Sequence, residues 1–539
     1  MKKVFALLLT LILLFTGCGQ EEAPGESSSA AQETVSGSSQ TQRPQVDTDN
    51  LPKSPEATQD ALALPEVLAT SEEGYEVIAL TPAQYDMECP LNRGGFRGFL
   101  QMDYFQAKQD GKVAIFSPEG ELLSDYIYDD NEDGWGARYG YITLKKEGKY
   151  GVVDLDGNQV VPFEYEYAWP ANEDGTLFEV TKQDKNYLVN DQGEQVLELG
   201  DRGSGYEFDE LDGTYASLKN GVLQFYDKDL KPIKNVACDE VRVSYTKKDR
   251  VVYSTGGKFG ILDSYGETIL APVYDDIDYF SGDYAVFTQN NKKGILDSNG
   301  EVAFDAQWDD IYYYGPFTAE DGQEQTPSAS FMKGDQWGVA TDLSSGQLLV
   351  EPKYDFIGRF GRYYASIEEG GKFGAIDRQG NVVLEPVYDT AVESADTNLE
   401  EGYLTIEGTD GPFSAGIIDT AGNMILPTDN YIVFASQQND YNLVLTPDEK
   451  WGYIDNKGQF VIQPKFEDAD RFAGDTAIVK LNGKICLIDR DGEVVLSTVF
   501  TDVTAYNPET MVFAAQYTDP EGRSKYCLAK FVMPVMDKY

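Results

Sequence analysis

The residues best placed to hold a metal ion lie in one acidic stretch, residues 129–134, which reads DDNEDG. Asp129, Asn131 and Asp133 follow the order of an oxygen-rich calcium loop. The twelfth position of such a loop is Gly140 here, so the glutamate that supplies two oxygens in an EF-hand is missing. We favour an acidic turn without a metal, and keep a Ca²⁺ site at these three residues as the alternative. No other cofactor is expected.

Catalytic chemistry is limited by the absence of histidine from all 539 residues. This excludes Ser-His-Asp and Cys-His catalysis and every metal site that needs an imidazole ligand. The 92 Asp and Glu residues could supply a carboxylate pair for glycoside hydrolysis, but no pair stands out by its position. We therefore assign no catalytic residue and predict that the chain is not an enzyme, with an extracytoplasmic polysaccharide hydrolase or lyase as the alternative.

The cysteines offer one candidate cross-link. Five are present, at positions 18, 89, 238, 486 and 527, and none forms the C-x-x-C pair of a zinc ribbon or a thioredoxin-like motif. In an oxidising compartment Cys486 and Cys527 could join the last repeat to the carboxyl-terminal strand. Buried free thiols at these two positions are an equally good interpretation, so both stay open.

The amino terminus has the pattern of an export signal. Lys2 and Lys3 precede an apolar run over residues 4–15, whose helix of about 18 Å is too short for a bilayer core of about 30 Å. Its end, residues 14–18 with the sequence LFTGC, resembles the lipobox of bacterial lipoproteins, although Phe15 departs from the usual leucine. The resemblance implies that residues 1–17 are removed and that Cys18 is acylated. A lipid anchor would then hold the chain on the extracytoplasmic side of the cell membrane.

Composition indicates a polar tether and an acidic body. Residues 18–70 are rich in Ser, Gln, Glu, Thr and Ala, and no aromatic residue lies between Phe15 and Tyr75, so this segment is expected to be a flexible tether. Lys and Arg number 43 against 92 Asp and Glu, a net charge of −49. Such a charge repels phosphate backbones, so nucleic acid is not expected as a partner.

A nine-residue motif recurs with a period near 37 residues through the rest of the chain. It consists of a basic or polar residue, an aromatic residue, Gly, two apolar residues, Asp, two variable residues and Gly, with clear copies starting at Lys149, Lys258, Lys372 and Lys450. Weaker copies raise the number to eleven. Asp followed three residues later by Gly predicts a three-residue hairpin turn with the glycine at positive φ.

Each motif is followed by two further predicted strands. The first ends in a Pro-x-aromatic-acid signature such as residues 272–275, and the second resembles residues 284–287. We predict an all-β domain over residues 71–539, with about eleven tandem three-stranded antiparallel meanders that bury their apolar faces by stacking. Because closed rings usually have four to eight blades, two propeller-like halves or an open superhelix fit better than one ring. We favour propeller-like packing, with an open β-solenoid as the alternative and residues 526–529 as a closing strand.

The motif resembles the WG-repeat family of bacterial lipoproteins, over about residues 111–500. The aromatic-Gly pairs that carry the resemblance are Tyr150-Gly151, Phe259-Gly260, Trp337-Gly338, Phe373-Gly374 and Trp451-Gly452. Only two of these pairs keep tryptophan. The resemblance implies an all-β array with an interaction role, and the recurring aromatic residues are expected to be a packing layer rather than a sugar-binding surface.

These observations favour a membrane-anchored binding or scaffolding protein whose partner is a cell-surface protein or glycan. A solute-binding lipoprotein is a further alternative, although the alternating helices and strands expected of it are absent from the sequence pattern.

The anchor can be tested with Cys18→Ser. We expect this variant to lack acylation and to remain unprocessed by the lipoprotein signal peptidase, because the modified sulfur is gone. Metabolic labelling with a radioactive fatty acid and detergent phase partitioning would measure the change. Maturation and detergent partitioning identical to those of the wild type would contradict the lipoprotein interpretation.

Overall fold

The computed structural model describes residues 66–533 with internal gaps. The residues left undescribed within this range are 73, 81–103, 110, 131–136, 202–206, 245, 319–323, 394–398, 409–414, 429–430, 435–440, 508 and 519–523. The chain divides into Met1–Ala57 and Thr58–Tyr539, and every described residue belongs to the second unit. The predicted signal peptide and Cys18 therefore lie outside the described residues. In the described part, no helix is long and apolar enough to cross a membrane.

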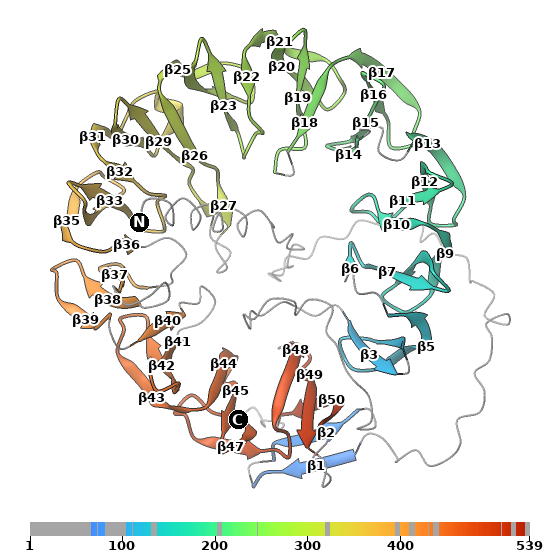
Figure 1. The fold of residues 1–539 in the computed structure, drawn as a ribbon, viewed down its shortest axis with the longest axis vertical. Helices are drawn as coiled ribbons and strands as arrows, with labels where there is room; N and C mark the ends of the chain where they lie inside the picture. Colours follow the sequence, from blue (N-terminus) through green and yellow to red (C-terminus); the bar gives the residue numbers. More distant parts are fainter. Residues whose placement is uncertain are drawn as a thin grey trace, which may run out of the picture. The chain divides into compact units, whose positions relative to one another are not determined.

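The described residues form a propeller of twelve blades, each a small antiparallel sheet (Figure 1). Blades 1 to 4 comprise β3 (Phe105–Gln109), β4 (Lys112–Phe116), β5 (Leu122–Asp129); β6 (Ala137–Arg138), β7 (Tyr141–Lys146), β8 (Lys149–Asp154), β9 (Gln159–Tyr165); β10 (Tyr167–Pro170), β11 (Leu177–Lys182), β12 (Lys185–Asn190), β13 (Gln195–Asp201); and β14 (Glu207–Leu211), β15 (Thr214–Lys219), β16 (Val222–Tyr226), β17 (Pro232–Ala237).

Blades 5 to 8 comprise β18 (Glu240–Val243), β19 (Arg250–Thr255), β20 (Lys258–Asp263), β21 (Thr268–Tyr274); β22 (Asp276–Ile277), β23 (Tyr284–Gln289), β24 (Lys292–Asp297), β25 (Val302–Trp308); β26 (Asp310–Tyr314), β29 (Ser328–Lys333), β30 (Gln336–Ala340), β31 (Val350–Tyr354); and β32 (Phe356–Ile357), β33 (Tyr364–Glu369), β34 (Lys372–Asp377), β35 (Val382–Tyr388). Blade 7 also carries a small hairpin, β27 (Phe317–Thr318) with β28 (Glu324–Gln325), and a 3-10 turn, η2 (Leu343–Ser345).

Blades 9 to 12 comprise β36 (Val392–Glu393), β37 (Tyr403–Glu407), β38 (Ala415–Asp419), β39 (Met424–Leu426); β40 (Ile432–Phe434), β41 (Tyr441–Leu445), β42 (Trp451–Asp455), β43 (Phe460–Phe466); β44 (Asp468–Ala473), β45 (Thr476–Leu481), β46 (Lys484–Ile488), β47 (Val494–Ser497); and β48 (Asp502–Asn507), β49 (Val512–Thr518), β50 (Ser524–Val532), β2 (Glu76–Ala79), β1 (Glu66–Thr70). In each four-stranded blade the first strand lies toward the centre of the ring and the fourth on its outside (Figure 1).

The predicted all-β, propeller-like fold is confirmed, but the predicted three-stranded unit is wrong. The motif strand β20 and the following strand β21 pair in blade 5, whereas the third strand of the predicted unit, β23, pairs with β24 in blade 6. The sequence repeat therefore spans two blades. The missing fourth strand is the inner one, which is as short as the two residues of β22 and leaves no periodic pattern in the sequence.

The eleven predicted motif units correspond to blades 1 to 11, and a twelfth blade without the motif closes one ring, so the preference for two rings or a superhelix is wrong. The twelfth blade lacks the motif, since it is assembled from both ends of the described chain: β2 pairs with β50 from Glu76↔Val532 to Ala79↔Ala529. The predicted closing strand, residues 526–529, lies within β50 and is confirmed. Strand β1 lies inside the predicted tether of residues 18–70, so the β domain begins at least five residues earlier than predicted.

The register of each blade explains why the motif needs glycine after the aromatic residue. Trp337 pairs with Tyr354, the aromatic residue of the Pro-x-aromatic-acid signature, and the register then shifts before Val339 pairs with Val350. The displaced outer strand passes so close that a Cβ on Gly338 would lie 2.4 Å from the carbonyl oxygen of Val350. Only glycine leaves room for this approach. The same clash would arise at glycines 151, 260, 374, 416 and 452.

The Asp-Gly turns form as predicted. In blade 5 the Asp263 carboxylate accepts hydrogen bonds from the backbone N–H groups of Tyr265 (2.9 Å) and Glu267 (2.8 Å). Gly266 closes the turn at φ 79°, and Leu230, the one non-glycine at this position, adopts φ 59°. The side chain of Asp263 thus fixes the turn while the glycine supplies the left-handed conformation.

Packing between blades provides the core. At the contact of blades 7 and 8, Trp337, Val339 and Tyr354 bury against Ile357 and Ile367. Fully burying one such side chain contributes about 1.5–3 kcal/mol relative to leaving it in water. Trp337 and Phe259 are only 7% and 8% exposed, so the prediction that the repeated aromatic residues are a packing layer is confirmed for both.

A pair of alanine substitutions tests the register. Gly338→Ala should destabilise the protein by about 1–3 kcal/mol, because its methyl group would overlap the backbone of β31. Gly358→Ala, whose Cβ would meet its nearest neighbour at an ordinary 3.5 Å, should change stability by less than about 0.5 kcal/mol. Urea denaturation midpoints measure both, and equal midpoints for the two variants would contradict the close strand approach.

Candidate functional site

The ring has two faces that carry different connections. Because successive strands of a blade run antiparallel, the loops from inner to second strand share one face with the Asp-Gly turns, which we call the turn face. The hairpins between second and third strands share the opposite face with the links from one blade to the next, which we call the hairpin face. The acid of the Pro-x-aromatic-acid signature lies at such a link, as Asp275, Asp355 and Glu467 do.

On the hairpin face this acid joins neighbouring blades. Asp275 accepts a hydrogen bond and ion pair from Lys258 Nζ in blade 5, and its other oxygen accepts from the backbone N–H of Asn290 (2.7 Å) in the β23–β24 hairpin of blade 6. Asp309 repeats the arrangement with Lys292 and with the N–H of Gly334 (2.8 Å). One carboxylate thus holds two blades, and the aligned lysine is the basic residue of the motif.

Charge pairing has a direct electrostatic consequence at these links. The hydrogen bond from the lysine ammonium, with a second from the backbone N–H, lowers the pKa of Asp275 and of Asp309 below the ordinary value of 3.8. These acids therefore remain ionised in the folded ring at pH values where free aspartate becomes protonated.

The predicted calcium loop begins at the same structural position. Asp129 is the link acid of blade 1: one oxygen pairs with Lys112 Nζ (2.5 Å) and the other accepts from the N–H of Gly148 (2.7 Å). Asn131 and Asp133 lie outside the described residues. Among the residues that the structure describes, no three Cys, Asp or Glu side chains gather as a metal site would require. The Ca²⁺ alternative at Asp129, Asn131 and Asp133 stays a prediction.

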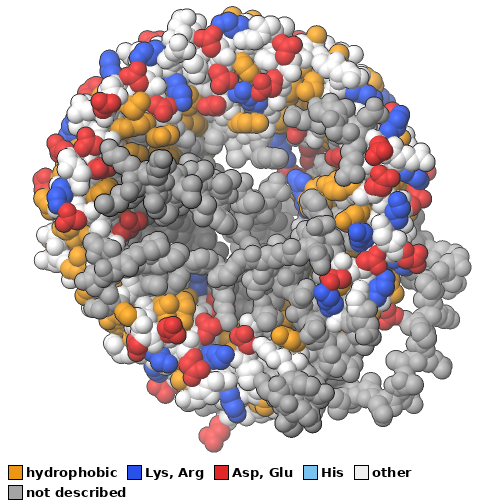
Figure 2. Space-filling view, viewed as in Figure 1, with side chains coloured by type: hydrophobic (Ala, Val, Ile, Leu, Met, Phe, Trp, Pro, Cys, Tyr) orange, Lys and Arg blue, Asp and Glu red, His pale blue; other side chains and the backbone are white. Residues whose placement is uncertain are grey.

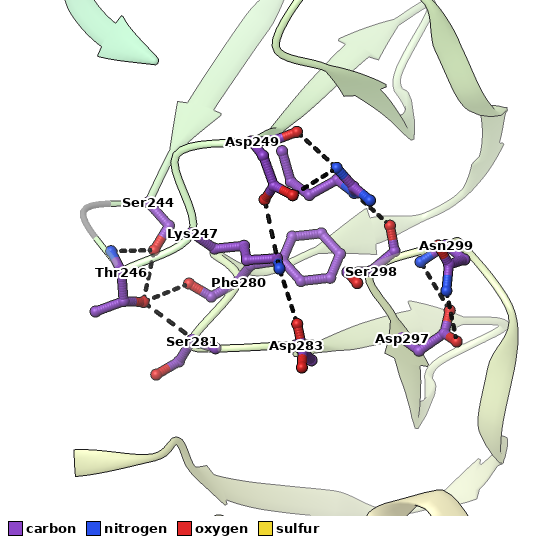
Figure 3. Close-up of polar contacts among 12 residues, drawn as sticks. Ser244, Thr246, Lys247, Asp249, Phe280, Ser281, Asp283, Asp297, Ser298 and Asn299 are labelled. Atoms are coloured by element: carbon purple, nitrogen blue, oxygen red, sulfur yellow. Dashed lines mark hydrogen bonds and ion pairs between the residues drawn. The ribbon is translucent and has the colours of Figure 1, made fainter. Parts of the chain in front are cut away.

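The turn face carries a polar network between blades 5 and 6, in the loop from β18 to β19 (Figure 3). Lys247 Nζ lies 2.8 Å from the carboxylate of Asp283 in blade 6 and 3.5 Å from Asp249. Arg250 pairs with Asp249 (2.9 Å) and donates through Nε to the carbonyl oxygen of Ser298 (2.5 Å). The hydrogen bond to Asp283 raises the pKa of Lys247.

This network continues toward blade 3. Lys248 forms an ion pair with Glu173, whose own backbone N–H donates to Glu210 Oε2 (2.9 Å) in blade 4. Glu210 also pairs with Lys228 (2.7 Å). Opposite charges pair here and position the loops of four blades, although Asp249 Oδ1 is buried without a hydrogen bond and has only the Lys247 ammonium at 3.5 Å. Sequence analysis missed this network, although a basic run at 247–250 in so acidic a chain was a usable signal.

The two candidate disulfide cysteines are both buried and free, so the predicted cross-link is not formed. Cys486 packs in the core between blades 10 and 11, while its neighbours Ile485 and Leu487 point to the opposite side of β46, where Cys527 packs. Alternation along the strand therefore directs the two thiols into different cores. Burial raises the pKa of Cys527 to about 12, as expected for an unreactive thiol.

All five predicted aromatic-Gly pairs lie at the start of third strands, in β8, β20, β30, β34 and β42. Trp337 also stacks on Tyr312 of β26, with ring centroids 4.8 Å apart and an interplanar angle of 7°. The motif residues therefore build the blades. They are spread around the ring and are not brought together in one site.

Comparison with protein families identifies the repeat. The description "WG containing repeat" matches residues 150–185, 259–292, 344–373, 373–399 and 451–484, and four of these segments begin at the aromatic residue of the motif. These five segments of the chain are WG repeats. The match concerns the repeats alone, and no curated protein matches the chain.

Solved structures similar to this ring share little sequence with it. A eukaryotic initiation factor structure is 11% identical over 74% of this chain and 100% of its own, with a TM-score of 0.31. BamB from Moraxella catarrhalis is 14% identical over 60% and 96%, with a TM-score of 0.18. The WD40 β-propeller domain of Doa1 is 12% identical over 51% and 95%, with a TM-score of 0.21.

The link acids predict a defined pH dependence. Because folding lowers the pKa of Asp275 and Asp309, their stabilisation is present above pH 3.8 and is lost as pH falls through their lower folded values. Asp275→Asn with Asp309→Asn should therefore lower the melting temperature at pH 5, and the difference from wild type should shrink toward pH 2.

The control is Asp305→Asn, on the exposed outer side of β25, which removes a carboxylate without touching a link. Its melting temperature should follow that of the wild type across the same pH range. A difference between the double variant and wild type that stays constant from pH 5 to pH 2 would contradict the role of the links.

Proposed function

We propose that this WG-repeat propeller is a membrane-anchored extracytoplasmic protein that binds or organises a cell-surface protein or glycan and performs no chemistry. The observation that carries the proposal is how the ring uses its charged groups. In blades 3 to 7 the described networks join charges of opposite sign across blade boundaries, as in the Lys258–Asp275 and Lys247–Asp283 pairs. These charged groups hold neighbouring blades together around the ring, and they do not converge on one position where a substrate could react.

Repetition supports an extended binding surface. Similar loops recur from blade to blade, and on the face seen in Figure 2 acidic, basic and apolar side chains are interspersed over the described part of the ring. A polymeric or multivalent partner could contact several blades at once, which raises overall avidity above the affinity of any single contact. The absence of histidine, the commonest acid-base group at neutral pH, agrees with a role without catalysis.

The anchor part of the proposal rests on the amino-terminal sequence. The lipobox-like end at Cys18 and the polar composition of the residues before β1 suit a lipid anchor with a spacer. These residues would then link the lipid on Cys18 to the ring.

Binding can be tested with the Cys18→Ser chain, which keeps every strand of the closed ring. We expect it to bind a subset of targets on arrays of cell-wall glycans and extracytoplasmic proteins, without releasing reducing ends or peptides. Because the net charge is −49, a basic protein target should be released by added salt, whereas a neutral glycan should remain bound.

The control for nonspecific charge binding is an unrelated protein of similar net charge on the same arrays. Turnover of an array target that disappears on changing one Asp or Glu, with folding and binding unchanged, would identify a catalytic carboxylate. That outcome would overturn the proposal in favour of the hydrolase or lyase.

A further inference from the structure

The two amino-terminal strands of the closing blade are held very differently. Strand β2 lies between β50 and β1 in the sheet, and its Val77 and Ala79 are 0% and 7% exposed. Val77 belongs to the core shared by blades 11 and 12, and the N–H of Leu80, directly after the strand, donates to the carbonyl oxygen of Leu528 (2.9 Å). Strand β2 is therefore part of the core that closes the ring.

Strand β1 has much weaker support. It lies at the edge of the sheet and pairs with β2 alone, and its register shifts between Val67 and Ala69. The Val67 side chain is 52% exposed, and Leu68 and Ala69 are only partly buried against the core of blades 11 and 12. None of the side chains described in β1 is buried, so little apolar surface opposes its removal.

Because β1 is the first described strand of the chain, a force applied to the amino-terminal segment acts on β1 first. Glu66 begins β1, and residues 1–65 precede it, so a force on that segment enters the ring through β1. The load then passes to β2 across the β1–β2 pairing and from there to β50. The β1–β2 interface is weaker than the β2–β50 interface, because no described side chain of β1 is buried. We therefore expect the β1–β2 pairing to break first.

We infer that β1 is a detachable strand which yields to tension on the amino-terminal segment while β2 keeps the twelve-blade ring closed. Release frees residues 66–75, which adds up to about 35 Å of chain at full extension. It also uncovers the outer edge of β2, whose backbone N–H and C=O groups become available to another strand. The inference rests on the proposed lipid anchor only for the origin of the tension.

The test applies force to the full-length chain in an optical trap. Azide-bearing residues at positions 50 and 299 attach the handles, so that one lies before β1 and the other in the exposed turn between β24 and β25 of blade 6. We expect a first reversible lengthening of up to about 35 Å, before any event that unfolds blades.

Two disulfide locks identify the strand that moves. Val67→Cys with Ile78→Cys joins the register partners of β1 and β2 and should abolish the first step when oxidised and restore it when reduced. Ile78→Cys with Lys530→Cys joins β2 to β50 and should leave the first step unchanged. A first step that survives the β1–β2 lock, or is lost with the β2–β50 lock, would overturn the inference.

These results are independent of the anchor, because the handles supply the force. Absence of lipid on Cys18 in cells would overturn the proposed function and leave the measured step as it is. Absence of the step in a chain that carries its lipid would overturn the detachable strand alone.

Discussion

A blade of this protein cannot bury its own apolar faces, and this constraint governs the whole ring. Each blade is a single sheet of short strands with apolar side chains on both sides, such as Val252 and Ile261 on one side of blade 5 and Val251 and Leu262 on the other. Two neighbours are needed to cover both sides. An open array would leave two uncovered end faces, whereas a closed ring leaves none, which is why strands from both ends of the described chain meet in one sheet.

The acid-lysine links fix the orientation of neighbouring blades, which apolar packing alone does not determine. Apolar contact alone does not specify the angle between two sheets, because hydrophobic burial has no direction. A carboxylate such as that of Asp275 has directional bonds to a lysine on one side and to a hairpin N–H on the other, so it fixes the relative position of both blades. The same pairs reduce local repulsion in a chain of net charge −49.

Local chemistry explains which features could be predicted from the sequence. The Asp-Gly turns and the glycine after each motif aromatic depend on backbone conformation and close approach within one blade, and both leave a residue-specific signal, as Gly266 and Gly338 illustrate. The two-residue strand β22 leaves no such signal. The pairing of β23 with β24, instead of with the preceding strands β20 and β21, cannot be read from the repeat period. Strand register in the folded ring determines which cores Cys486 and Cys527 enter. It also determines that Asp129 contacts the hairpin of the next blade.

Closure by both ends also sets an order of events in the life of the chain. A polypeptide is made from its amino terminus, so β2 is available long before β50, its partner in the sheet. Blades 1 to 11 can form and stack as they emerge, but the faces that meet at the seam stay exposed until β50 has been made. Pairing between strands so distant in sequence is slow to form. The nascent chain therefore passes through an open state in which the apolar faces of its terminal blades are exposed. Synthesis or export that releases β50 before the ring closes would suit this architecture.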